Sequence, residues 1–207
     1  RRRSTPFSAL PRKPPDHDLR PSGNLHHLDG HDPRSASRRI LSAARVIAAR
    51  AGAGKITIDA VAKEAGLSKG GVLYNYPTKK ALLSGLLDAM LAEHRELLES
   101  VPERHPARTL RGHLETVLQS QEVDDDLSMA ILATAASDPQ LLDPLRGELS
   151  DDIGRILSDT QDPQGAMVVF WAIQGVRFQK LLKLPDGGAD LRGRVIERLR
   201  TLIDELE

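Results

Sequence analysis

Apolar residues recur at the three- and four-residue spacing of amphipathic helices almost throughout the chain after residue 34. No stretch alternates convincingly in the manner of a strand. Glycines and prolines divide the pattern into segments, because glycine favours a helix end and proline cannot continue a helix. The sequence therefore predicts an all-α protein of about nine helices and no sheet. The predicted helices span residues 35–51, 57–65, 68–74, 78–101, 107–121, 126–137, 140–159, 163–183 and 190–206.

Residues 1–33 show no such period. They hold six prolines among scattered polar residues, a composition typical of disordered segments. Residue types that ligate metals occur there, but a flexible leader that happens to contain them is the simpler interpretation. We predict a disordered leader and no metal site. The potential ligands in this segment are His26, His27, Asp29, His31 and Asp32.

Charge divides the rest of the chain into two parts. Residues 34–80 hold ten Lys and Arg against two acidic residues, a net charge of +8. Residues 81–207 hold 13 basic against 23 acidic residues, a net charge of −10, and the whole chain is neutral. A compact basic block on an acidic protein indicates contact with a polyanion, although a solvated charged face would have the same composition. We expect domains over 34–80 and 81–207.

Composition and motifs exclude several classes of protein. The chain has no cysteine, so disulfides, zinc–thiolate sites and thiol nucleophiles are impossible. No apolar run approaches the roughly 18–20 residues of a membrane span, and we expect a cytoplasmic protein. Residues 52–55 resemble a phosphate-binding loop, but alanine stands at position 49 and isoleucine at position 56. Because no other catalytic motif occurs, we expect no enzyme and no cofactor.

The basic block contains a candidate helix-turn-helix. Thr57 can cap the first short helix by accepting a hydrogen bond from a backbone N–H, and Ser68 can cap the second. Gly66, between them, can adopt the left-handed conformation that a tight inter-helix turn needs. Two short helices joined in this way form a helix-turn-helix, although an ordinary helical hairpin can show the same spacing.

The position of the positive charge favours DNA binding. The second short helix would present non-acidic residues to the major groove. The next helix begins with Thr78, Lys79 and Lys80, where a helix N-terminus and two cations can hold a phosphate. The residues expected to face outward are Lys69, Gly70, Gly71, Tyr74 and Asn75.

Residues 35–85 resemble the N-terminal domain of the tetracycline-repressor (TetR) family of bacterial regulators. The match includes the stretch GLSKGGVLYNYPTKKALL at residues 66–83. The resemblance implies a homodimer with an N-terminal three-helix DNA-binding domain and a C-terminal domain that binds a small effector and dimerises. It also implies a repressor on a near-palindromic operator, associated with the nucleoid. An activator of the same fold fits equally, and a helical small-molecule-binding or interaction protein is the alternative from another class.

The resemblance assigns roles to individual positions. Thr57 and Lys79 would contact phosphates, and Lys69, Gly70 and Gly71 would meet the groove, with Tyr74 and Asn75 on bases or backbone. Two positions depart from the family pattern. The family often has Thr or Ser where Gly71 stands, and its recognition-helix tyrosine falls at Leu73, one place before Tyr74. The operator sequence therefore does not follow from relatives.

The C-terminal region offers weaker signals. The last two predicted helices carry apolar stripes, which either cover their own core or pair in a dimer, and the resemblance favours the dimer. Asp124 to Asp126 most simply begin a helix and stabilise its dipole, with a cation site as the alternative. Met, aromatic, His and Gln residues at helical spacing are candidates for an effector pocket, although most such residues are core. These candidates are Met90, His94, His113, Met129, Phe170, Trp171, Gln174 and Phe178.

Overall fold

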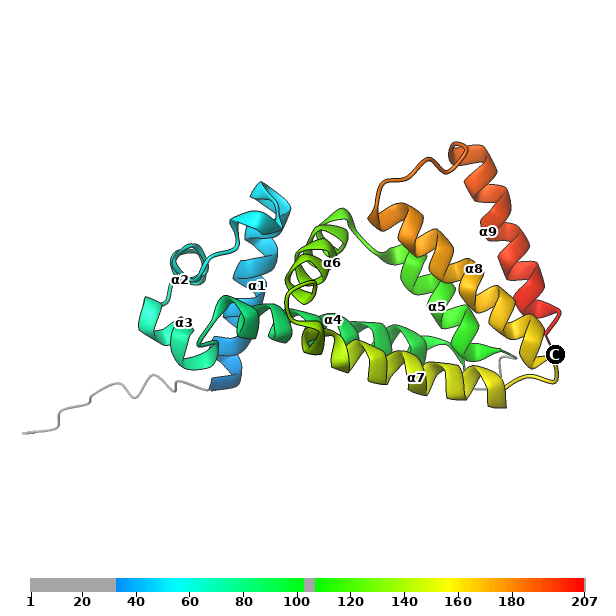
Figure 1. The fold of residues 1–207 in the computed structure, drawn as a ribbon, viewed down its shortest axis with the longest axis horizontal. Helices are drawn as coiled ribbons and strands as arrows, with labels where there is room; N and C mark the ends of the chain where they lie inside the picture. Colours follow the sequence, from blue (N-terminus) through cyan, green and yellow to red (C-terminus); the bar gives the residue numbers. More distant parts are fainter. Residues whose placement is uncertain (1–32, 103–106, 207) are drawn as a thin grey trace, which may run out of the picture. The chain divides into compact units, whose positions relative to one another are not determined.

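A computed structural model describes residues 33–102 and 107–206. Of the predicted disordered leader, residues 1–33, only residue 33 is described. The potential metal ligands of that leader all lie outside the described residues. Within them the chain is all-helical, with nine α-helices, two 3₁₀ turns and no strand, as the sequence predicts (Figure 1). The elements are α1 (Pro33–Ala51), η1 (Ala53–Lys55), α2 (Ile58–Ala65), α3 (Lys69–Asn75), α4 (Lys79–Ser100), α5 (Arg108–Gln119), α6 (Glu122–Ala135), η2 (Pro139–Leu142), α7 (Asp143–Ser158), α8 (Pro163–Leu181) and α9 (Ala189–Asp204).

Two helix starts differ from the sequence prediction. Helix α6 begins at Glu122 rather than at residue 126, because the Asp124 carboxylate accepts a hydrogen bond from the Gln121 backbone N–H at 3.2 Å and caps the turn. The acidic residues thus occupy the first turn, where the helix dipole favours them. The predicted helix over 140–159 begins as the turn η2. Helix α7 follows with a proline in its first turn, where the missing N–H costs nothing.

The first hydrophobic core joins the N-terminal helices to α6. Its fully buried members include Ile40 of α1, Val61 of α2, Val72 of α3 and Leu82 of α4, and α6 contributes Leu127. Helix α6 contacts α1 and α4, and it also contacts α8 (Figure 1). The N-terminal helices are therefore packed directly against an element of the C-terminal region.

The second core lies among α5, α7, α8 and α9. Leu110, Ile156, Ile173 and Ile203 are buried members of it, one from each helix. Helices α5 and α7 each pack on both α4 and α8. The four helices α4, α5, α7 and α8 therefore face a common interior. No helix in the described ranges is long and apolar enough to cross a membrane.

Candidate functional site

The helix-turn-helix has the capping that its sequence predicts. The Thr57 hydroxyl accepts a hydrogen bond from the Ala60 backbone N–H at 3.1 Å, and the Ser68 hydroxyl accepts one from the Gly71 N–H at 3.0 Å. Gly66 ends α2 in the left-handed region, with φ 63°. The Arg39 guanidinium donates to the Ala65 carbonyl at 2.7 Å and thereby ties the turn to α1. Helices α2 and α3 are thus held in a fixed relation on α1.

Helix α3 exposes three of its predicted contact residues, whereas Gly71 and Asn75 are half-buried. Lys69 and Gly70 are exposed, and Tyr74 is 82% exposed. The Asn75 amide instead donates to the Gly71 carbonyl at 2.9 Å, so part of its hydrogen-bonding capacity is used within α3. The Lys69 ammonium lies 2.9 Å from the carboxylate of Asp59. Exposed ion pairs of this kind contribute little stability, so Lys69 can exchange partners.

The start of α4 provides a second exposed site. The Thr78 hydroxyl caps the helix by accepting from the Ala81 N–H at 3.0 Å. Lys79 is exposed and has no ion-pair partner within residues 33–102 and 107–206, whereas Lys80 pairs with Asp138. An uncommitted cation at a helix N-terminus is suited to a phosphate.

Tyr76 fixes α3 relative to α4. It follows the last residue of α3, and its hydroxyl lies 2.7 Å from the Ser37 hydroxyl of α1. Its ring covers Gly85 so closely that a Cβ atom at position 85 would lie 2.5 Å from the ring. This contact connects the position of α3 to the long helix α4.

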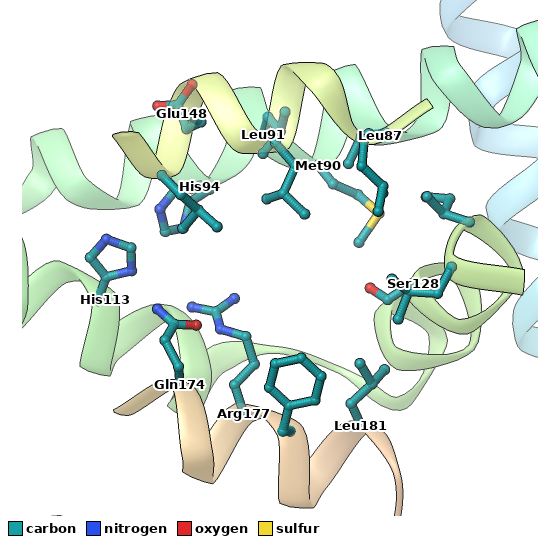
Figure 2. A pocket seen from close by; sticks show the side chains of 16 residues that line it. Leu87, Met90, Leu91, His94, His113, Ser128, Glu148, Gln174, Arg177 and Leu181 are labelled. Atoms are coloured by element: carbon teal, nitrogen blue, oxygen red, sulfur yellow. The ribbon is translucent and has the colours of Figure 1, made fainter. Parts of the chain in front are cut away.

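A cavity of about 280 Å³ lies among α4, α5, α6, α7 and α8. Its wall is mainly Leu, Ile and Met, and its charged, imidazole and amide groups gather at one end. Figure 2 shows His94 and His113 beside each other at that end, with Gln174 and Arg177 entering from α8. Met90 and Ser128 lie at the opposite end. The cavity can hold a small, largely apolar molecule with one polar group.

The structure brings together five of the eight predicted pocket residues and places the other three elsewhere. Phe170 belongs to the second core, where its ring meets His113 edge-on with centroids 5.1 Å apart. Met129 is 40% exposed on α6, and Trp171 is 63% exposed on α8. Helical spacing could not separate these sites, because α8 carries apolar residues on every side. The five residues that line the cavity are Met90, His94, His113, Gln174 and Phe178.

Family models match two parts of the chain. A family model described as "Bacterial regulatory proteins, tetR family" matches residues 40–86, and one described as "Tetracyclin repressor-like, C-terminal domain" matches residues 107–204. The chain belongs to the TetR family. Members are DNA-binding transcription factors rather than enzymes, and they bind small-molecule effectors, typically as dimers. This chain is therefore a DNA-binding transcriptional regulator, and the comparisons give no support to a helical carrier without DNA activity.

Several solved structures share the fold. A transcriptional regulator from Rhodococcus sp. RHA1 is 20% identical with a TM-score of 0.65, covering 82% of this chain and 95% of its own. A TetR regulator from Haloarcula marismortui is 19% identical with a TM-score of 0.65, covering 84% and 98%. The multidrug binding protein EbrR, solved with imidazole, is 22% identical with a TM-score of 0.59, covering 84% and 95%. No curated protein sequence matches the chain significantly.

Three charged residues of this TetR-family chain were not predicted. Arg177 and Glu148 line the cavity, and Asp152 of α7 is completely buried behind it. An arginine inside a largely apolar helical stretch is a signal from which the sequence could have identified Arg177 as a candidate site residue. The Arg177 guanidinium donates to the Thr116 hydroxyl at 2.7 Å while its Nε has no partner, and burial lowers its pKa.

Asp152 meets two imidazoles and a guanidinium. Its Oδ2 lies 3.0 Å from His113 Nε2 and 3.4 Å from His94 Nε2, and its Oδ1 accepts from Arg155 at 2.6 Å. Burial would raise the pKa of Asp152, but the contacts with His113, His94 and Arg155 outweigh it and hold that pKa well below 3.8. Burial lowers the pKa of His113 below 6.5, although Asp152 opposes this.

These pKa shifts predict that acid destabilises the protein. Below about pH 6.5 the unfolded chain protonates His113 while the folded chain does not, so the free energy of unfolding falls as the pH falls. The slope contributed by His113 approaches about 1.4 kcal/mol per pH unit. Below pH 3.8 the unfolded chain also protonates Asp152, whose folded pKa is lower, and the loss steepens. Urea denaturation from pH 7.5 to about pH 3 in EDTA measures both effects, and His113→Gln should flatten the profile between pH 6.5 and 5. A wild-type stability that stays constant over that interval contradicts the assignment.

Proposed function

We propose that this TetR-family regulator is a repressor that binds a near-palindromic operator as a homodimer and releases it when a small molecule fills the cavity. The observation that carries this proposal is continuity of packing. Leu91 of α4 and Ile131 of α6 line the cavity and also belong to the first core, which holds the helix-turn-helix. A molecule that displaces these side chains therefore acts on the core that positions α3.

The DNA contacts follow from the exposed ends of three helices. We place phosphate contacts at Thr57 and Lys79, at the N-termini of α2 and α4. The first residues of α3 and its exposed Tyr74 would enter the major groove, with the glycines allowing close approach of the backbone. We place the boundary between the DNA-binding domain, residues 34–80, and the C-terminal domain, residues 81–207, at the start of α4. The remaining proposed contacts are Lys69, Gly70, Gly71 and Asn75.

The proposed dimer interface is the outer face of α8 with α9. Val168 and Trp171 lie on one side of α8 and are exposed, and Gly175 on the same side has no atom within 4 Å of a Cβ position. Helix α9 adds the exposed Leu191 and Val195. Exposed large apolar residues grouped in this way are typical of an interaction site, and Gly175 permits helices to approach closely. A two-fold pair would place two helix-turn-helix units on successive major grooves, roughly 34–36 Å apart.

Two ion pairs of Arg45, one to α4 and one to α6, add to the proposed coupling. The Arg45 guanidinium of α1 lies 2.7 Å from Glu93 of α4 and 3.5 Å from Asp124 of α6. These contacts, with the shared core, make α4 and α6 the elements that transmit occupancy of the cavity. An effector that prefers the altered arrangement by 1–3 kcal/mol would change DNA affinity about 5–150-fold.

Selection of DNA and a reporter assay test the function. Duplexes selected from a random pool by the full-length protein should contain inverted half-sites. Placed across a bacterial promoter, such a site should lower reporter expression when the protein is present. Increased expression would make the regulator an activator, and failure to select any sequence would contradict specific DNA binding. As a regulator of chromosomal genes, the protein would act in the bacterial cytoplasm at the nucleoid.

We expect Lys79→Ala to weaken binding to every duplex and to reduce the salt slope by about one unit, because one phosphate contact is lost from each half-site. Fluorescence anisotropy with a single half-site duplex from 50 to 200 mM salt measures the slope. Arg194→Ala, an exposed α9 residue that pairs with Asp190, is the control and should leave it unchanged. Equal slopes for wild type and Lys79→Ala would remove Lys79 from the interface.

A further inference from the structure

The polar end of the cavity gathers metal-ligating atoms from three helices. His94 of α4, His113 of α5 and Asp152 of α7 each offer one ligand atom, and these atoms all lie within 4.8 Å of one another. Both histidines also line the cavity, side by side in Figure 2. We propose that His94, His113 and Asp152 bind one divalent transition-metal ion of the Zn²⁺ class at this end of the cavity.

Two of the three ligand-atom distances, those from Asp152 to each histidine, are distances found around a single ion. Two ligands about 2.1 Å from a metal are about 3.0 Å apart at a right angle and about 3.4 Å apart at the tetrahedral angle. Asp152 Oδ2 lies 3.0 Å from His113 Nε2 and 3.4 Å from His94 Nε2. Both imidazoles thus approach the same carboxylate oxygen at distances that ligands of one ion adopt.

The buried imidazole of His113 lacks the hydrogen bonds that a buried polar group normally makes. Its side chain is 1% exposed, yet neither ring nitrogen makes an aligned hydrogen bond to another described residue. Its Nε2 is close to Asp152 Oδ2, but the ring N–H does not point along that line. An unpaired buried polar group destabilises a protein by about 1–3 kcal/mol, and coordination of an ion by Nε2 would remove that cost for one of the two ring nitrogens. Burial also lowers the pKa of His113, which favours the neutral ring that ligates metals.

Arg155 orients the Asp152 carboxylate, and the three ligand types favour particular metals. Arg155 donates to Asp152 Oδ1 at 2.6 Å, so the carboxylate is oriented and Oδ2 remains for the ion. Two imidazoles and one carboxylate favour Zn²⁺, Fe²⁺, Ni²⁺ or Cu²⁺ over Mg²⁺ and Ca²⁺, which prefer oxygen ligands. Three protein ligands also leave coordination positions open on the cavity side, where an oxygen or nitrogen of a bound molecule could coordinate.

Zinc titration of the full chain tests the proposal. By isothermal titration calorimetry without DNA, we expect one tight Zn²⁺ per chain, unaffected by millimolar Mg²⁺, together with a rise in melting temperature. Co²⁺ bound to the same site should give visible d–d absorption. His94→Ala alters a partly exposed ligand and should lower the affinity by roughly 100-fold or more, since loss of an outer-shell partner alone costs about 10–100-fold. Asp152→Asn, which keeps the shape of the buried side chain, should do the same.

The histidines of the N-terminal segment require a matched control. A variant with His17→Ala, His26→Ala, His27→Ala and His31→Ala should keep the tight site and the Co²⁺ spectrum. Tight binding that vanishes in this quadruple variant, persists in His94→Ala, or is absent from the wild type overturns the proposal. The metal site goes beyond the proposed repression, and because no DNA enters the measurement, its failure would leave that function standing.

Discussion

Trp171→Glu is expected to convert the dimer into a monomer and to lower operator affinity by at least about 100-fold. Trp171 is 63% exposed in the single chain, and in the proposed two-fold interface it would be buried from both protomers. Truncating or charging a central aromatic residue typically costs 2 kcal/mol or more. Two-fold symmetry doubles that cost, so the dimer dissociation constant should rise roughly 1000-fold. Separate protomers also lose the roughly 10²–10⁴-fold advantage of binding two linked half-sites.

Sedimentation velocity and anisotropy with a two-half-site duplex measure the two effects of Trp171→Glu. Met129→Glu is the matched control, because Met129 is also exposed but lies on α6, outside the proposed interface. It should leave both the dimer and the affinity unchanged. A Trp171→Glu protein that remains a dimer would place the interface on another face.

Gly85→Val is expected to lower DNA affinity at least tenfold while the C-terminal helices remain folded. A Cβ atom at position 85 would lie 2.5 Å from the Tyr76 ring, so the ring must leave α4. Its hydroxyl then loses Ser37 of α1, 2.7 Å away, and α3 loses its fixed position. Inserting bulk into a packed site typically costs 1–3 kcal/mol, and the lost hydrogen bond adds about 1 kcal/mol.

The control for Gly85→Val is Gly154→Val. Gly154 lies within the helix α7, and its Cβ position has no neighbour within 4 Å. Its free energy of unfolding should change by less than about 0.5 kcal/mol, since valine is at least as good a helix residue as glycine. Urea denaturation and DNA anisotropy are measured on both variants. Equal DNA affinities in the two would show that Tyr76 does not position α3.

The helix-turn-helix could be predicted because its signals are local. Thr57, Gly66 and Ser68 act within three or four residues of their own positions, and the structure forms each cap where the sequence places it. The sequence prediction started α6 too late, because the sequence alone does not show whether an aspartate lies before a helix or inside its first turn. Capping geometry, and not residue type, decides between them.

The cavity depended on information that the sequence does not contain. Because α8 is apolar all round, its pattern does not distinguish the side with Gln174, facing the cavity, from the side with Trp171, facing outward. Asp151 and Asp152 are adjacent and chemically identical, yet one is exposed and the other completely buried. Only the packing of α4, α5 and α7 brings Asp152 to two histidines distant in the sequence.

The double position of α6 constrains how this regulator can change over evolution. Ile131 forms part of the cavity wall and part of the core beneath the helix-turn-helix. A smaller residue there would make room for a bulkier effector, and it would remove volume from the core that keeps α2 and α3 in place. Changes in effector preference through this wall therefore need compensating substitutions in α1 or α4, whereas the α8 wall, which lies outside that core, can vary independently.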